Sequence, residues 1–245
     1  DVVFLSVINS ISTILEAKSI IFDKLEGFIK KFYTNELIKG VILFIGLGLL
    51  YFIFTLLIEY FLWLSTSGRT ILFWLFVGVE SFLLIRFIAF PLFKLFKLQQ
   101  GINYEQASEI IGNHFSEVQD KLLNFLQLAN QSQTSELLAA SIEQKAASLQ
   151  PIPFSNAVNF AKNKKFLPYA IVPILLLILF FVTGNSEIIS KSFTRVVNYE
   201  TKYAPPAPFE FVVLNKSLTT QQNSDFLLQV KTQGKVMPEN VAIQI

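Results

Sequence analysis

Two long apolar runs separated by a short polar break constrain this chain more than any other feature. The runs cover residues 37–64 and 71–93, and the break between them contains the sequence STSGRT. Each run has the roughly 20 residues that a helix needs to cross about 30 Å of hydrocarbon. So short a break allows only a tight turn, so we predict an antiparallel membrane hairpin over residues 36–97. A third apolar run predicts another spanning helix at residues 167–183.

The composition is typical of an integral membrane protein and narrows the possible functions. Apolar residues make up 52% of the chain and charged residues only 16%, a balance that is unusual for a soluble domain. The net charge of +2 and the absence of a basic stripe interleaved with aromatic residues argue against a nucleic-acid partner. Because the chain has no cysteine, disulfides and thiolate metal sites are excluded.

Residues 1–35 predict an amphipathic helix, because apolar residues recur at steps of three and four. Two interpretations stay open for this helix. It covers another part of the protein, or it lies in the membrane interface with Lys24, Lys30 and Lys31 near anionic headgroups.

The segment between the second and third spans, residues 98–166, predicts a small helical insert. Capping boxes are expected at Asn103–Gln106 and at Ser116–Gln119, where a side chain at the helix start and one three residues later cap each other's backbone. A helix end is expected at Gly112–Asn113, because glycine favours the left-handed conformation that closes many helices.

After the third span, the sequence changes to short runs of β-forming residues separated by polar segments. Residues 184–208 predict a stalk, formed by a short helix or an extended segment over residues 186–200, followed by a stiff Pro-rich linker. Residues 209–245 contain the short runs FEFVVL, DFLLQVKT and VAIQI, separated by turn-like sequences. We expect these runs to begin an immunoglobulin-like sandwich that continues beyond Ile245. The predicted fold is therefore a mostly α membrane protein with the truncated start of a β-sandwich.

The lysines predict the orientation of the chain in the membrane. Basic residues gather before the first span, after the second and before the third, whereas the hairpin turn holds only Arg69. Since cytoplasmic loops are enriched in Lys and Arg, the N-terminus and the insert are expected in the cytoplasm and the C-terminus in the periplasm. The residues predicted at the membrane interface are Trp63, Trp74, Lys30, Lys31, Lys94, Lys97, Lys164 and Lys165.

Three ionisable residues fall within the predicted hairpin. Glu59 lies about one turn from the outer end, so it is expected to be an interfacial carboxylate. Arg86 is close enough to the inner end to extend its guanidinium to the interface. Glu80 lies roughly ten residues into its span, where an unpaired charge is costly. It is therefore either a neutral structural carboxyl or a functional group whose partner belongs to another helix or another protein.

No catalytic constellation is visible in the sequence. His114 is the only histidine and has no companion for a zinc site, so it is interpreted as a turn residue at a helix junction. No phosphate-binding loop, dinucleotide fingerprint or nucleophile elbow is present. We therefore predict a non-enzymatic protein without a metal or another cofactor.

Two stretches carry a family resemblance. They are residues 21–40, IFDKLEGFIKKFYTNELIKG, together with the hairpin that follows, and residues 107–128, ASEIIGNHFSEVQDKLLNFLQL. They resemble an uncharacterised family of large Bacteroidetes inner-membrane proteins, known as a domain of unknown function. The chain departs from that family at Ser116, where relatives have a proline that would also suit a helix N-terminus. The resemblance covers residues 21–245 and implies a periplasmic part that continues into Ig-like and long helical regions.

The sequence favours a membrane anchor or scaffold subunit of a bacterial cell-envelope assembly, serving export, gliding or envelope maintenance. One alternative is a proton-coupled or motor-associated unit that uses Glu80. Another is a signalling receptor whose periplasmic domain senses a ligand. The expected partners are the lipid bilayer and other envelope proteins, or further copies of the chain bound through its spans.

Overall fold

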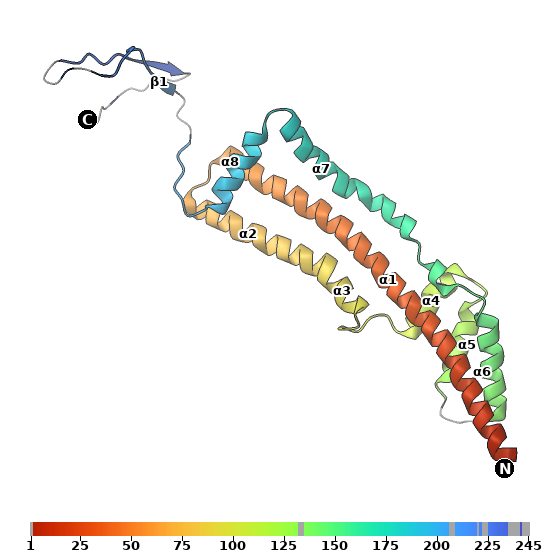
Figure 1. Ribbon diagram of the computed structural model, residues 1–245. Helices are drawn as coiled ribbons and strands as arrows, with labels where there is room; N and C mark the ends of the chain where they lie inside the picture. The colour runs from red at the N-terminus through yellow and green to blue at the C-terminus, as the bar shows by residue number, and fades with distance from the viewer. Residues whose placement is uncertain are drawn as a thin grey trace.

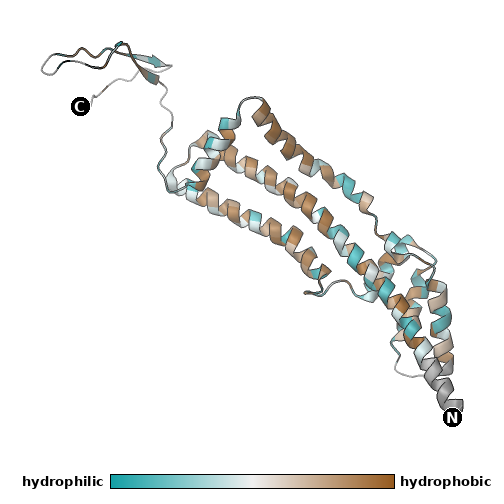
Figure 2. Ribbon diagram, in the orientation of Figure 1, coloured by the Kyte–Doolittle hydropathy of each residue, from teal (hydrophilic) through white to brown (hydrophobic). Residues whose placement is uncertain are grey.

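The computed structural model describes residues 2–131, 135–205, 209–219, 221, 225–234 and 241. The chain forms a long layer of helices with a helical bundle at the N-terminal end and a small sheet near the C-terminus (Figure 1). It is mostly α-helical, as predicted, and three helices are long and apolar enough to cross a membrane. The apolar residues concentrate on these helices, between the bundle and the opposite end of the layer (Figure 2).

The central element is helix α1, Val2–Leu62, which is 61 residues long. At 1.5 Å per residue it extends about 90 Å. The predicted amphipathic helix and the predicted first span are thus parts of one continuous helix. Its N-terminal half packs against the insert through Ile14, Ile21, Leu25 and Phe28, which corresponds to the first of the two interpretations of residues 1–35.

The hairpin turn is shorter than the polar break in the sequence. Helix α2, Thr66–Leu84, begins directly after Ser65, whose side chain accepts a hydrogen bond from the Gly68 N–H. Most of the STSGRT sequence therefore forms the first turns of α2, because Ser65 is an efficient helix cap.

The second candidate span changes its helical pitch near the end that leads to the insert. It continues from α2 into a π-helical turn, Ile85–Ala89, and then into α3, Phe90–Leu95. Pro91 has no N–H to donate to the Phe87 carbonyl four residues earlier. This carbonyl points at α1, where a Cβ added to Gly40 would lie 1.9 Å from the Phe87 oxygen. The wide turn and the glycine together let the two helices come into close contact.

The third candidate span is helix α7, Leu167–Val182, preceded by 3₁₀ turns at Phe154–Ala157 and Phe160–Phe166. Helix α1 lies between α2 and α7 and contacts both (Figure 1). On α1, Gly46 approaches the Tyr169 backbone of the third span, whereas Gly48 faces α2. The two glycines therefore allow α1 to pack closely against two different helices, α7 at Gly46 and α2 at Gly48.

After α7 the chain folds back, and the segment that follows forms the short helix of the two predicted alternatives instead of an extended stalk. Gly184 has a φ of +75° and reverses the chain direction, as its position after the span predicts. Helix α8, Ser186–Val197, then crosses the ends of α1 and α2. Its apolar face is buried there through Ile189 and Val196.

The insert forms three helices, α4 (Tyr104–His114), α5 (Gln119–Ala129) and α6 (Glu136–Leu149). The capping box at Asn103–Gln106 is present. The second predicted box is wrong, because α5 begins only at Gln119, after Val118, and no side chain caps it. The predicted helix end at Gly112 is also wrong: α4 continues to His114, and a Cβ at Gly112 would lie 2.4 Å from the Gln119 Cβ. Gly112 is thus suited to close contact between α4 and α5.

Two lysines of α1 bind the carboxyl ends of insert helices. The Lys18 ammonium donates a hydrogen bond of 2.7 Å to the Ala129 carbonyl at the end of α5. The Lys24 ammonium donates to the Gln150 and Leu149 carbonyls at the end of α6. A cation is favourable there because the last carbonyls of a helix have no intrahelical partner and carry partial negative charge. These contacts fix the insert helices to α1.

The C-terminal part forms a two-stranded antiparallel sheet, β1 (Phe209–Val213) and β2 (Val230–Gly234). The register pairs Phe209 with Gly234 and Val213 with Val230. The second predicted run contributes a strand only from Val230 onward. Of the run VAIQI, only Val241 is among the described residues, so the immunoglobulin-like sandwich stays a prediction.

Candidate functional site

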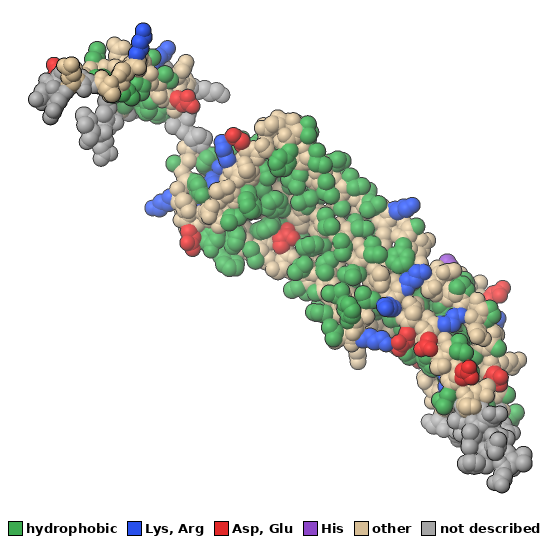
Figure 3. All heavy atoms as spheres, viewed as in Figure 1, with side chains coloured by type: hydrophobic (Ala, Val, Ile, Leu, Met, Phe, Trp, Pro, Cys, Tyr) green, Lys and Arg blue, Asp and Glu red, His purple; other side chains and the backbone are tan. Residues whose placement is uncertain are grey.

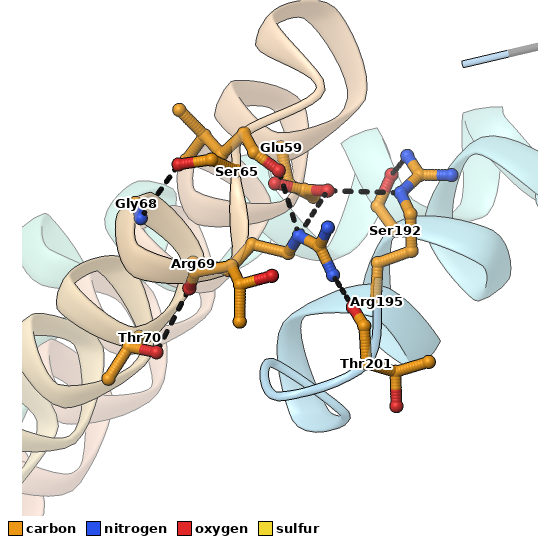
Figure 4. Close-up of polar contacts among 10 residues, drawn as sticks. Glu59, Ser65, Gly68, Arg69, Thr70, Ser192, Arg195 and Thr201 are labelled. Carbon is orange, nitrogen blue, oxygen red and sulfur yellow. Dashed lines mark hydrogen bonds and ion pairs between the residues drawn. The ribbon is translucent and has the colours of Figure 1, made fainter. Parts of the chain in front are cut away.

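A buried polar cluster lies at the end of the hairpin that is remote from the insert. Glu59, one turn before the end of α1, is fully buried. Its Oε1 accepts a hydrogen bond of 3.1 Å from the Arg195 Nε and lies 3.5 Å from the Arg69 Nε (Figure 4). Arg69 belongs to the first turns of α2 and Arg195 to α8. One carboxylate oxygen therefore joins three helices, and we call this Arg69–Glu59–Arg195 cluster the clamp.

Arg69 extends the clamp to the turn and to the linker. Its Nε donates to the Leu64 carbonyl at 3.0 Å, and its Nη1 donates to the Thr201 carbonyl at 2.7 Å (Figure 4). The guanidinium carbon lies 4.9 Å from the ring centroid of Tyr203. Because Thr201 and Tyr203 follow α8, the start of the C-terminal segment is held on the hairpin.

Arg195 is bound by a hydroxyl and an aromatic ring. Its Nη2 donates to the Ser192 hydroxyl at 3.2 Å, and its guanidinium carbon lies 4.2 Å from the Trp63 ring centroid. Trp63 adopts the left-handed conformation, with a φ of 44°, which costs a residue with a side chain about 1–2 kcal/mol. A desolvated cation–π contact contributes about 2 kcal/mol, enough to offset that strain.

The electrostatics of the clamp are unbalanced, because two guanidinium groups share one carboxylate. Buried charges are tolerated only when they are paired and hydrogen-bonded. Glu59 Oε2 has no hydrogen-bond partner among the described residues, so the pairing rests on Oε1. Removing one member of a buried ion pair typically costs about 3–5 kcal/mol. The clamp is therefore suited to holding helices together.

The sequence pattern did not reveal the clamp. Glu59 was expected at the interface, and Trp63 was expected to face headgroups instead of Arg195. Arg195 does carry a recognisable signal, because it falls on the same helical face as Ile189, Ser192 and Val196. An arginine on the buried face of an amphipathic helix implies a buried acidic partner. Its partner is 136 residues away in the sequence, so no local pattern identifies it.

The other ionisable residues of the hairpin do not join the clamp. Glu80 lies on α2 facing Gly48, and its Oε1 is buried without a hydrogen-bond partner in the described part of the chain. Arg86 does not pair with it and instead lies with its guanidinium carbon 5.9 Å from the Phe87 ring centroid. Trp74 on α2 is 59% exposed, and its place at the membrane interface stays a prediction.

The six lysines predicted at the membrane interface lie at the insert end of the candidate spans. Lys31 and Lys165 stack on the rings of Phe160 and Phe166, at 5.7 and 5.0 Å, and Lys164 is exposed. The remaining three, Lys30, Lys94 and Lys97, line a pocket of about 740 Å³ between α1 and the connection from α3 to α4.

His114 lies exposed at the end of α4, with its ring 4.6 Å from that of Phe115. Within the described ranges, no group of three or more His, Asp or Glu residues could hold a metal ion. Comparisons with protein-family models, curated proteins and solved structures give no match for this chain. The class that the structure itself defines is a chain with three candidate membrane spans, a helical bundle at one end and a buried clamp at the other.

Proposed function

We propose that this chain is a non-enzymatic inner-membrane anchor, or scaffold subunit, of a bacterial cell-envelope assembly that serves export, gliding or envelope maintenance. The observation that carries the proposal is the clamp, which fixes α8 and the residues after it to the end of the hairpin. The chain beyond Tyr203 would then be a periplasmic arm presented by a rigid membrane base.

The clamp changes how a force on that arm is distributed. A segment attached only through α7 would pivot about a single helix. Here Arg69 binds the Thr201 carbonyl and Arg195 binds Glu59, so a pull on the arm is shared by α1, α2 and α7. The Pro-rich composition after Tyr203 predicts a stiff segment, which would transmit the force to the clamp with little extension. This arrangement suits an anchor.

The lysines support the proposed orientation. The basic residues at the insert end of the spans favour a cytoplasmic insert, and the clamp then lies on the periplasmic side. The resemblance to a family of large Bacteroidetes inner-membrane proteins supports the same arrangement.

Affinity purification of the full-length protein from native membranes, followed by mass spectrometry, tests the proposal. Wild-type protein is expected to bring envelope proteins with it. Arg195→Gln, which breaks the clamp, should lose periplasmic partners. Arg86→Gln removes the same charge from an exposed arginine outside the clamp and should retain them. Recovery of the wild-type chain without any envelope partner would contradict the anchor function.

A second candidate is a proton-coupled or motor-associated membrane unit. It is favoured by Glu80, whose Oε1 lies buried without a hydrogen-bond partner among the described residues, in the middle of a candidate span. A carboxyl in such a place is expensive to ionise and is often functional. If it moves protons, Glu80→Gln should fail to restore a deletion strain at a normal protein level, whereas Glu36→Gln should restore it. Full restoration by Glu80→Gln would eliminate this candidate.

A further inference from the structure

The pocket at the insert end of the spans combines positive charge with an apolar wall. It encloses about 740 Å³ and lies between α1 and the connection that leads from α3 to α4. Its apolar wall includes Ile29, Leu95 and Leu98. Its polar lining includes Glu26, Lys30, Tyr33, Lys94, Lys97 and Tyr104.

The pocket lies at the level where the candidate spans end. Lys94 is in the last turn of α3, next to Leu95, the final residue of the second candidate span. Figure 3 shows charged side chains gathered where the apolar belt of the spans meets the bundle. Next to the pocket, Phe90 and Phe93 of α3 are 41% and 45% exposed, and Phe96 just after α3 is 66% exposed. The pocket therefore borders a surface suited to acyl chains. A phospholipid headgroup occupies this depth in a bilayer.

The charges in the pocket leave a net attraction for an anion. Lys97 is paired with Glu26 at 2.8 Å, and Glu26 also accepts a hydrogen bond from the Tyr104 hydroxyl at 3.1 Å. These two bonds hold the pKa of the Glu26 carboxyl below its usual value. In the part of the chain that the structure describes, neither Lys30 nor Lys94 forms an ion pair. The Lys94 ammonium lies 5.9 Å from the Tyr33 ring centroid, a contact that leaves its N–H groups free to donate to an anion. Two lysines are thus available to an anion.

The far wall of the pocket is held in place before any ligand binds. The Tyr33 hydroxyl accepts a hydrogen bond of 2.7 Å from the Ile102 N–H. The backbone at Gly101 packs on the same ring, and an added Cβ there would lie 2.9 Å from the Tyr33 side chain. Because Tyr33 is buried, the connection carrying Gln99 and Gln100 is fixed beside the lysines. A preorganised site loses less entropy on binding.

We propose that this pocket binds the phosphate-bearing headgroup of an anionic phospholipid, with its phosphate between Lys30 and Lys94 and its acyl chains along the exposed apolar side chains of α3. Basic pockets between membrane helices are suited to such headgroups. The site goes beyond the anchor function and requires only that the candidate spans lie in lipid, in either orientation.

Lipid titration of the purified full chain in detergent, followed by native mass spectrometry, tests the site. Phosphatidylglycerol is expected to bind and phosphatidylcholine to bind much more weakly. The double variant Lys30→Gln/Lys94→Gln should bind phosphatidylglycerol about 30-fold more weakly, as expected for two lysines near an anionic group. The control Lys164→Gln/Lys165→Gln removes the same charge at the same end of the spans, outside the pocket, and should bind as wild type.

A second pair of variants changes shape without changing charge. Gly27 lines the pocket, and an added Cβ there meets no atom within 4 Å. Gly27→Leu should fill the pocket and weaken phosphatidylglycerol binding at least tenfold. Gly78 on α2 has the same open surroundings outside the pocket, so Gly78→Leu should leave binding unchanged.

Three results would overturn the proposal. Equal losses in the two lysine pairs would reduce the binding to general attraction by a basic surface. Unchanged binding in both Gly27→Leu and Lys30→Gln/Lys94→Gln would place the lipid elsewhere. Full displacement of phosphatidylglycerol by inorganic phosphate would show that the pocket recognises free phosphate, whereas retention of the lipid supports the site as proposed.

Discussion

Single glycines of α1 differ in what surrounds them, and stability should follow that difference. A Cβ at Gly27 meets nothing within 4 Å, whereas one at Gly40 would lie 1.9 Å from the Phe87 carbonyl oxygen. Gly27→Ala should stabilise the protein by about 1 kcal/mol, because alanine restricts the unfolded chain and favours helix. Gly40→Ala should destabilise it by more than that, because α1 and the π turn must separate. Thermal unfolding in detergent measures both, and equal effects would contradict the close contact at Gly40.

Glu59 should be the most sensitive carboxylate of the described chain. Glu59→Gln leaves two buried guanidinium groups without a counter-charge, and we expect a loss of about 3–5 kcal/mol in the free energy of unfolding. Glu36, whose ion pair with Lys39 is partly exposed at 3.4 Å, supplies the control. Glu36→Gln should cost less than about 1 kcal/mol. Similar losses in the two variants, measured by unfolding in detergent, would mean that the clamp does not hold the helices together.

Among the helices, the ends of α5 and α6 depend on lysines of another element. Lys18→Met keeps the length of the side chain but removes the hydrogen bond to the Ala129 carbonyl. We expect a loss of about 1 kcal/mol and faster amide hydrogen exchange at the end of α5. Lys121 is exposed on α5, so Lys121→Met should change neither quantity. If exchange at the end of α5 is unaffected in Lys18→Met, the lysine does not stabilise that end.

Elements that depend on local chemistry could be predicted from the sequence, and elements that depend on distant contacts could not. The apolar runs predicted the three candidate spans, and Asn103 predicted the start of α4. The prediction of a helix end at Gly112 was wrong because a glycine can be required for two reasons. A left-handed turn favours glycine, but here glycine is required because Gln119 packs closely against it. The clamp was missed because Glu59 and Arg195 meet only after α8 folds back over the hairpin. The N-terminal helix was predicted as a separate element because α1 packs against the insert in its first half and becomes apolar in its second half. The structure shows one continuous helix.

For the protein as a whole, the orientation in the membrane is the prediction on which the anchor function depends. The chain has no cysteine, so single cysteines can be introduced at exposed positions. Gln131→Cys lies in the insert and Ser67→Cys in the first turn of α2, next to the hairpin turn, and both sites are exposed. A membrane-impermeant maleimide added to intact cells with a permeable outer membrane should label Ser67→Cys and spare Gln131→Cys until the inner membrane is broken. The reverse pattern would put the clamp in the cytoplasm.

The unbroken length of α1 has a mechanical consequence. The same 61-residue rod carries the insert at one end and Glu59 at the other, with no hinge between them. A residue inserted between Asn35 and Glu36 would rotate one end by about 100° relative to the other and lengthen the rod by about 1.5 Å. The number of residues in α1 thus fixes the rotation of the bundle relative to the clamp about the helix axis. A tilt or twist of one end is transmitted along the helix to the other.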